Sequence, residues 1–308
     1  MKVAALFSGC GGLDYGFEKA GFDIVWANDF DKYAVQTYNE NFKTPAVCED
    51  ITKLNYDSIP EHDVLIGGFP CQPFSMMGEE MGFEDRRGTL FFKVMDIVDN
   101  QKKRGHQPKI IVLENVRTLM THDKGRTFKV IKSELESRGY TVHPKLINSH
   151  DYGVPQTRNR VFLVCFLGDN IEYTFPEPTP NDLTLQDMLE TDVDDKYFLS
   201  EKIKKTILAD GGGNYYAKAE TDLPIARPLT ATMAKMHRAC QDNYVTQNGR
   251  LRRLTPRECA RLQGFPDTFR IVVSDSQAYK QFGNAVTVNV SYAIAKSIIE
   301  KVNELNDN

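Results

Sequence analysis

The first 170 residues alternate short apolar runs, rich in β-branched residues, with segments whose apolar residues recur at helical spacing. The strand-like runs cover residues 3–7, 24–28, 64–69, 110–114 and 161–166, and helical spacing appears over 13–20, 31–41, 90–100 and 129–137. Strands that alternate with helices in this way form βαβ units and a mainly parallel, doubly wound sheet. We therefore expect an α/β, Rossmann-like fold whose ligands bind beyond the carboxyl ends of the strands.

A proline-rich break at residues 175–180 ends this alternation. Beyond it the periodicity is poor and loops rich in glycine and proline are frequent, until helical spacing returns over 285–305. This pattern indicates a smaller, irregular second domain, followed by a helix that packs back on the first. We expect the first domain to comprise residues 1–178 and 270–308, and the second to comprise residues 179–269.

Positive charge is concentrated in one part of an otherwise acidic chain. The net charge is −4, yet residues 202–261 contain 12 lysines and arginines against 5 acidic residues. That segment therefore carries +7 and the remainder of the chain −11. A localised basic region is typical of a face that binds a polyanion such as nucleic acid, although a lysine-rich solvated surface has the same composition.

The cysteines, at positions 10, 48, 71, 165, 240 and 259, form no C-x-x-C pair. We therefore expect free thiols, no structural zinc or other metal, and a reducing, cytoplasmic compartment. No apolar stretch approaches the roughly 20 residues of a membrane span. The N-terminal residues lack the apolar core and cleavage site of a signal peptide.

The first strand-like run leads into a glycine-rich turn, SGCGG, at residues 8–12. Glycine lets the backbone turn tightly and approach a ligand closely. The dinucleotide fingerprint needs a third glycine where this chain has Asp14, which counts against NAD or FAD. Asp29 ends the second strand where a ribose diol would be bound, and Asp50 could accept a hydrogen bond from an adenine amino group. These features favour S-adenosylmethionine, although both aspartates could instead cap helices.

Cys71 follows the strand expected at 64–69, within the sequence GGFPCQPFS of residues 67–75. Pro70 and Pro73 restrict the backbone on both sides of the cysteine and end the strand there. The sequence therefore predicts a thiol held rigidly at the functional edge of the sheet, whereas most lone loop cysteines are inert.

This cysteine segment resembles the active-site motif of the DNA (cytosine-5)-methyltransferases. The other signature blocks of that family follow in order, at residues 7–12, 114–116, 156–160, 253–267 and 281–286. The resemblance covers nearly the whole chain except about residues 175–250. The compact length is similar to that of the bacterial restriction–modification enzymes of HhaI type.

The resemblance implies methyl transfer from S-adenosylmethionine to C5 of a cytosine turned out of duplex DNA. Cys71 would add to C6, as in covalent catalysis. Glu114 would donate a hydrogen bond or a proton at N3. Arg158 would contact O2, and Arg160 would support the same cluster or a nearby phosphate. Without the resemblance, the residues alone favour Glu114 as a helix cap and the two arginines as members of surface salt bridges.

The resemblance also implies a binding site for each partner. The residues expected to bind the methyl donor are Phe7, Ser8, Gly9, Cys10, Gly12, Asp29, Phe30, Asp50, Ile51, Gly68, Pro70, Leu90, Asn284 and Val286. Those expected to contact DNA are Ser75, Arg86, Arg87, Arg227, Lys235, His237 and Arg238. Residues 75–90 would close over the flipped base, and residues 179–269 would recognise the target sequence.

Other interpretations stay open at this point. A tRNA cytosine methyltransferase would share Cys71 and the glycine turn, and the basic segment favours DNA over it. A NAD-dependent oxidoreductase with a reactive Cys71 would leave Glu114 and the paired arginines unexplained. A silent DNA-binding repressor is disfavoured by the same residues. We expect a monomer that acts on double-stranded DNA and is paired functionally with a restriction endonuclease.

Overall fold

The protein is described from a computed structural model that covers residues 1–70, 90–179, 181–208, 220–235, 237 and 241–307. The expected nucleophile and part of the expected DNA contacts lie outside the described residues. They are Cys71, Ser75, Arg86, Arg87 and Arg238, together with the expected closing loop up to residue 89.

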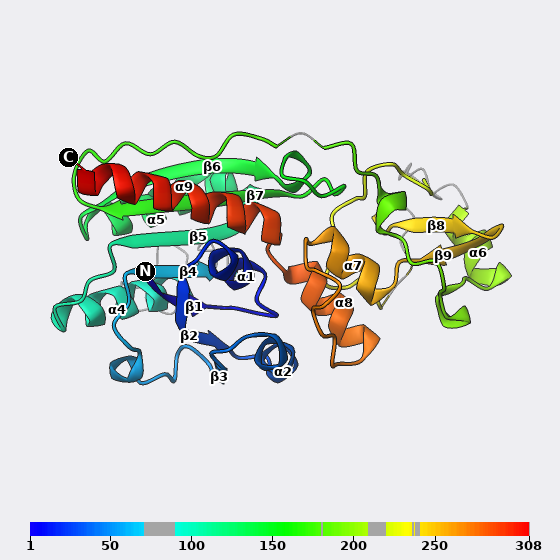
Figure 1. Cartoon of the computed structure of the whole chain (residues 1–308), viewed down its shortest axis with the longest axis horizontal. Helices are drawn as coiled ribbons and strands as arrows, with labels where there is room; N and C mark the ends of the chain where they lie inside the picture. The colour runs from blue at the N-terminus through cyan, green and yellow to red at the C-terminus, as the bar shows by residue number, and fades with distance from the viewer. Residues whose placement is uncertain (71–89, 180, 209–219, 236, 238–240, 308) are drawn as a thin grey trace.

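A seven-stranded sheet with the order β3-β2-β1-β4-β5-β7-β6 forms the centre of the larger part of the molecule, on the left in Figure 1. The parallel strands are β1 (Lys2–Leu6), β2 (Asp23–Asp29), β3 (Ala46–Cys48), β4 (Val64–Gly68) and β5 (Ile110–Val116). Strand β7 (Asn159–Leu167) is antiparallel to β5, and β6 (Tyr140–Asn148) is antiparallel to β7. The prediction of an α/β fold with a mainly parallel sheet is confirmed.

Two of these strands, β3 and β6, were not expected from the sequence. Strand β3 has three residues, too few to show a period. Strand β6 lies at the edge of the sheet and contains Pro144, a residue that sheets tolerate at edges because no backbone N–H is needed there.

Helices cover both faces of the sheet (Figure 1). One face packs against α1 (Gly12–Lys19), α2 (Lys32–Asn41) and α9 (Val288–Asp307), and the other against α4 (Leu90–Lys103) and α5 (Arg126–Glu136). Alternate side chains of β1 enter the two cores, with Val3 and Ala5 on the first face and Ala4 and Leu6 on the second. Burial on both faces explains why this strand is continuously apolar.

Helix α9, near the C-terminus, packs directly against α1 of the first domain. At Gly16 of α1 a side chain's Cβ would lie 2.3 Å from the Ser291 hydroxyl of α9, so only glycine permits this approach. The Ser291 hydroxyl in turn donates a hydrogen bond to the carbonyl of Leu13. The two ends of the chain are thus joined beside the glycine turn.

The segment after β7 is irregular, as expected. It contains α6 (Glu201–Leu208) and a two-stranded antiparallel sheet of β8 (Tyr244–Gln247) and β9 (Arg250–Arg253). Helices α7 (Pro256–Leu262) and α8 (Asp275–Asn284) lie between this small sheet and the large one (Figure 1). Side chains of α7 belong to the same hydrophobic core as the large sheet, so the expected boundary at residue 269 stays a prediction.

The remaining short elements are 3-10 turns. They are η1 (Tyr56–Ser58), η3 (Arg117–Met120), η4 (His122–Gly125), η5 (Ser149–Asp151), η6 (Leu185–Met188) and η7 (Asp195–Tyr197). Among the described residues, no helix has the length and apolar character that crossing a membrane requires.

Candidate functional site

A cavity of about 340 Å³ opens at the carboxyl ends of β1, β2, β4 and β5. Its lining brings together most of the residues expected to bind the methyl donor: Phe7, Ser8, Gly9, Cys10, Gly12, Asp29, Phe30, Gly68, Pro70, Leu90, Asn284 and Val286. Three expected catalytic residues, Glu114, Arg158 and Arg160, line the same cavity. Residues far apart in the sequence therefore share one site, as the strand-end rule requires.

The glycine turn after β1 forms one wall of this cavity. Gly9 and Gly11 have φ angles of 56° and 91°, a left-handed conformation that glycine adopts without steric cost. Gly12 is required for a different reason, because a Cβ there would lie 2.2 Å from the backbone carbonyl oxygen of Val286. The turn thus needs its glycines both to bend and to meet the loop before α9.

Asp29 holds this turn from the end of β2. Its two carboxylate oxygens accept hydrogen bonds from the backbone N–H groups of Gly9 and Asp31, each at 2.8 Å. Burial raises the pKa of this carboxyl group above its usual value. Asp29 therefore has a structural role on the turn while its side chain also faces the cavity.

The structure does not bring Asp50 and Ile51 into the cavity. Asp50 is partly exposed and accepts hydrogen bonds from the backbone N–H and the hydroxyl of Thr52, at 2.9 and 2.8 Å. One oxygen of the carboxylate is thus used in a local turn, and no helix begins there for it to cap. Ile51 is buried in the hydrophobic core on the α4 side.

Glu114 and Arg160 form an ion pair inside the cavity. Arg160 Nε lies 2.9 Å from Glu114 Oε1. Burial raises the pKa of Glu114 even though Arg160 and Arg158 act in the opposite direction. A Cβ on Gly68 would lie 3.1 Å from Glu114 Oε2, so the glycine at the end of β4 leaves room for this carboxylate. The pair offers an acid and a cation side by side.

Arg158 has a different environment from the one expected. Its side chain is 1% exposed, and its guanidinium donates to the carbonyls of Leu229, Gly283 and Ala285 at 3.1, 3.1 and 2.9 Å. Burial, and then the nearby positive charge of Arg160, lower its pKa to about 9, which leaves it cationic at neutral pH. Arg158 is therefore bonded to three backbone carbonyls, whereas Arg160 is the arginine that pairs with Glu114.

Comparison with known proteins identifies the chain. The family model for C-5 cytosine-specific DNA methylases matches residues 1–300. The chain belongs to this family. M.NlaX, a Type II methyltransferase of Neisseria lactamica, is 41% identical over 317 residues, spanning 100% of this chain and 99% of the relative. M.HhaI, a Type II methyltransferase of Haemophilus parahaemolyticus, is 38% identical over 320 residues, spanning 98% and 95%.

Solved structures agree with the fold. The Entamoeba histolytica methyltransferase EhMeth superposes with a TM-score of 0.79 at 21% identity, covering 99% of this chain and 98% of its own. Dnmt2 of S. pombe gives a TM-score of 0.78 at 21% identity, with 99% of both chains covered. The resemblance inferred from the motifs is confirmed, and the protein is a DNA (cytosine-5)-methyltransferase. The oxidoreductase and repressor interpretations are set aside.

In this methyltransferase, Asn115 joins β5 to the segment that leads to the expected nucleophile. Its side-chain amide donates to the carbonyl of Phe69 at 2.8 Å, and its oxygen accepts from the N–H of Val116 at 2.9 Å. Phe69 lies two residues before Cys71. The motif at residues 114–116 contains Asn115 but does not show its role, because only the fold shows that its amide reaches the segment after β4.

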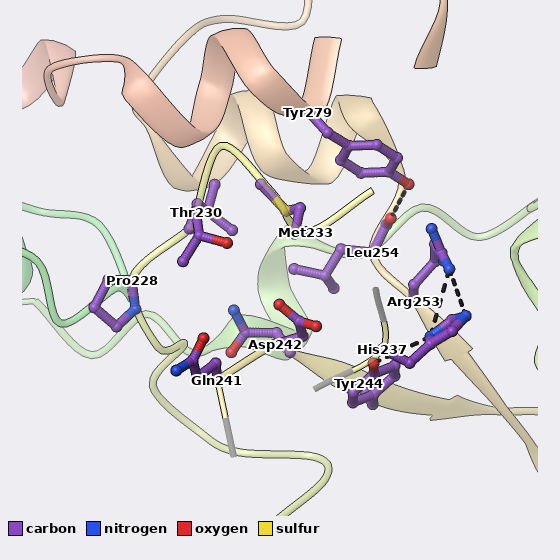
Figure 2. Close-up of a pocket in the computed structure, with 12 residues that line it drawn as sticks. Pro228, Thr230, Met233, His237, Gln241, Asp242, Tyr244, Arg253, Leu254 and Tyr279 are labelled. Atoms are coloured by element: carbon purple, nitrogen blue, oxygen red, sulfur yellow. Dashed lines mark hydrogen bonds between the residues drawn. The ribbon is translucent and has the colours of Figure 1, made fainter. Parts of the chain in front are cut away.

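The described part of the irregular segment contains three expected DNA contacts. Arg227 pairs with Glu220 at 2.8 Å, and Lys235 is exposed. His237 lies beside a small cavity of about 20 Å³, where Arg253 Nη2 is 2.7 Å from its Nε2 (Figure 2). Its Nδ1 lies 3.2 Å from the hydroxyl of Tyr244. These residues stay candidates for target recognition.

Proposed function

We propose that this enzyme transfers a methyl group from S-adenosylmethionine to C5 of a cytosine turned out of duplex DNA, through a covalent bond between Cys71 and C6. The observation that carries the proposal is the shared cavity. It joins the glycine turn held by Asp29, the Glu114–Arg160 pair, and Pro70, the residue directly before Cys71. The side of the cavity at the glycine turn suits a methyl donor, and the side at the Glu114–Arg160 pair suits a pyrimidine.

The wall around the glycine turn fits the donor. Among the described residues, nothing lies within 4 Å of the position that a Cβ on Gly9 would take, so the turn leaves space there for a ligand. Ser8 and Asp14 line the cavity there with buried polar side chains that interact with each other, so the wall is polar where the donor would lie. The Phe30 ring is 73% exposed and offers a flat apolar surface to an adenine. When bound, the donor supplies an electrophilic methyl group.

The residues of the other wall would act on the base. The Cys71 thiolate adds to C6, which moves an electron pair toward N3 and O2 and makes C5 nucleophilic. Glu114 donates a proton or a hydrogen bond at N3, and its raised pKa keeps a protonated fraction closer to neutral pH. Arg160, beside Glu114, stabilises the negative charge at O2. After methylation, loss of the C5 proton expels the Cys71 thiolate.

Arg158 and Asn115 would position these groups without touching the base. Arg158 ties the cavity to Leu229 of the irregular segment and to the loop after α8. Asn115 fixes the carbonyl of Phe69, and thereby the backbone that enters the Cys71 segment. A thiol must approach C6 within a narrow range of distance and direction, so both contacts contribute to the rate.

Relatives support duplex DNA as the substrate. M.NlaX and M.HhaI are both Type II methyltransferases and match this chain over nearly its full length. We accordingly favour a short specific duplex sequence over tRNA, read by residues 179–269. We also propose a cytoplasmic monomer, associated with the nucleoid through DNA and paired functionally with a restriction endonuclease, as in restriction–modification systems.

The deciding experiment begins with bisulfite sequencing of DNA from cells that express the chain, which gives the target site. A duplex carrying 5-fluorocytosine at that site should then form a covalent adduct, because fluorine does not leave as a proton does. Cys71→Ser should form no adduct while still binding the donor. Cys48→Ser, which removes an exposed free thiol, is the matched control and should keep the adduct. An active enzyme without any adduct would contradict the covalent mechanism.

A further inference from the structure

A compact basic surface follows β5 and is not used by the catalytic cavity. Residues 117–132 run through η3 and η4 into α5 and contain five lysines and arginines against one acidic residue, Asp123. The segment thus carries +4 in a chain whose net charge is −4. A concentration of positive charge in an acidic protein indicates a local polyanion partner.

This surface begins at the rim of the catalytic cavity. Val116 lines the cavity and is paired with Arg160 in the β5–β7 register. Arg117 is the next residue and starts η3, so it lies just beyond the Glu114–Arg160 pair. The carboxyl edge of β5 therefore leads directly from the proposed base site to the basic segment.

Internal ion pairs remove only part of this charge. Arg126 lies 2.6 Å from Asp123, and Lys132 lies 3.5 Å from Glu136. Arg117, Lys124 and Lys129 are exposed, and within the described part of the chain no ion pair joins them to a carboxylate. Three cations therefore remain available to a partner; we call them the rim cations.

The backbone holds the tip of this segment in a defined shape. Asp123, Lys124 and Gly125 follow one another with φ angles of 50°, 54° and 82°, a left-handed run that costs non-glycine residues about 1–2 kcal/mol each. His122 Nδ1 lies 2.7 Å from the hydroxyl of the buried Thr127 and closes the turn. Lys124 is thus carried on a constrained turn that other contacts stabilise.

We propose that the rim cations bind phosphates of the DNA strand beside the target cytosine. The inference rests on the proposed function, because a base that enters the cavity brings its flanking backbone past this rim. Lysine and arginine on phosphate position a duplex without reading its sequence. The contact would thus strengthen binding to target and non-target duplexes alike, separately from the recognition segment.

The test is the salt dependence of duplex binding. Each phosphate contact contributes about 0.9 to the slope of log K against log salt, so Arg117→Gln/Lys124→Gln/Lys129→Gln should lower the slope by about 2–3. At 0.1 M salt the same counterion term corresponds to a loss of affinity of about 100- to 1,000-fold for both target and non-target duplex. Binding of S-adenosylmethionine should not change.

A matched triple variant separates contact from net charge. Lys102 and Lys103 end α4 and Lys109 precedes β5, so these exposed lysines lie at the opposite edge of the sheet. Their replacement by glutamine should leave the slope near that of the wild type. An unchanged slope in the rim variant, or an equal fall in both variants, would overturn the inference. Failure of the proposed function would appear differently, as a wild-type enzyme that forms no adduct on 5-fluorocytosine.

Discussion

Arg158→Ala tests whether a buried arginine in the site acts on the substrate or on the protein. The guanidinium holds three carbonyls, of Leu229, Gly283 and Ala285, which belong to separate segments of the chain. If Arg158 holds these three segments together, its loss should lower the free energy of unfolding. If it were a base contact, its loss should lower the rate and leave stability nearly unchanged.

The magnitude follows from the contacts. Three carbonyls left without a donor cost about 1–3 kcal/mol each, and truncating a large buried side chain adds about 2–4 kcal/mol. Removing the cation also relieves its burial and its repulsion by Arg160, which lower the pKa of Arg158 to about 9 and correspond to roughly 5 kcal/mol. The net expectation is a loss of roughly 4 kcal/mol, and Arg158→Lys should retain part of it because an ammonium cannot reach all three carbonyls.

Urea unfolding followed by circular dichroism measures this loss, with turnover and donor binding measured on the same samples. Arg160→Ala is the internal comparison, because its described ion pair is with Glu114 and its side chain is 20% exposed. That variant leaves the buried Glu114 without its partner, so it should lose about 1–3 kcal/mol, less than Arg158→Ala, and about 100-fold or more in kcat. An inactive Arg158→Ala variant with wild-type stability would refute the inference that Arg158 holds the three backbone segments together.

Three further perturbations test neighbouring parts of the structure. Gly12→Ala places a Cβ 2.2 Å from Val286 O and should cost about 1–3 kcal/mol; calorimetry should show weaker donor binding, and wild-type affinity would contradict the close approach. Burial raises the pKa of Asp14 to about 7, so the free energy of unfolding should decrease as pH rises from about 4 to 7. In Asp14→Asn this decrease, measured by urea unfolding at each pH, should be smaller by up to about 4 kcal/mol. Glu258→Gln leaves Arg252 buried with a neutral partner, so thermal unfolding should show a loss of stability of about 3–5 kcal/mol. A loss below about 1 kcal/mol would contradict a stabilising ion pair between Arg252 and Glu258.

The sequence predicted the strands whose side chains are buried on both faces, because their apolar runs are continuous. It did not predict β6, since an edge strand with Pro144 and alternating burial shows a mixed pattern. The glycine turn and Asp29 were also predictable, because a strand end, a turn and a carboxylate follow fixed spacings. The turn that the Asp50 side chain makes with Thr52 could not be predicted, because it leaves no signal in the spacing.

The assignment of the two arginines depended on something the sequence does not show, which is where β7 begins. The strand starts at Asn159, so Arg160 lies within it and its register with Val116 directs it to Glu114. Arg158 precedes the strand and turns instead toward the backbone of other segments. The motif therefore does not distinguish Arg158 from Arg160, whereas the fold gives their side chains different partners.

The antiparallel direction of β7 is what makes this active site. In a purely parallel sheet, catalytic groups gather at strand ends that point one way, and a residue at the start of a strand lies at the opposite edge. Here β7 runs against β5, so its first residues meet the last residues of β5, and Arg160 reaches Glu114. A parallel β7 would separate the two by the length of the strand. The edge strand β6, which the sequence did not reveal, returns the chain to the catalytic edge so that β7 can start there.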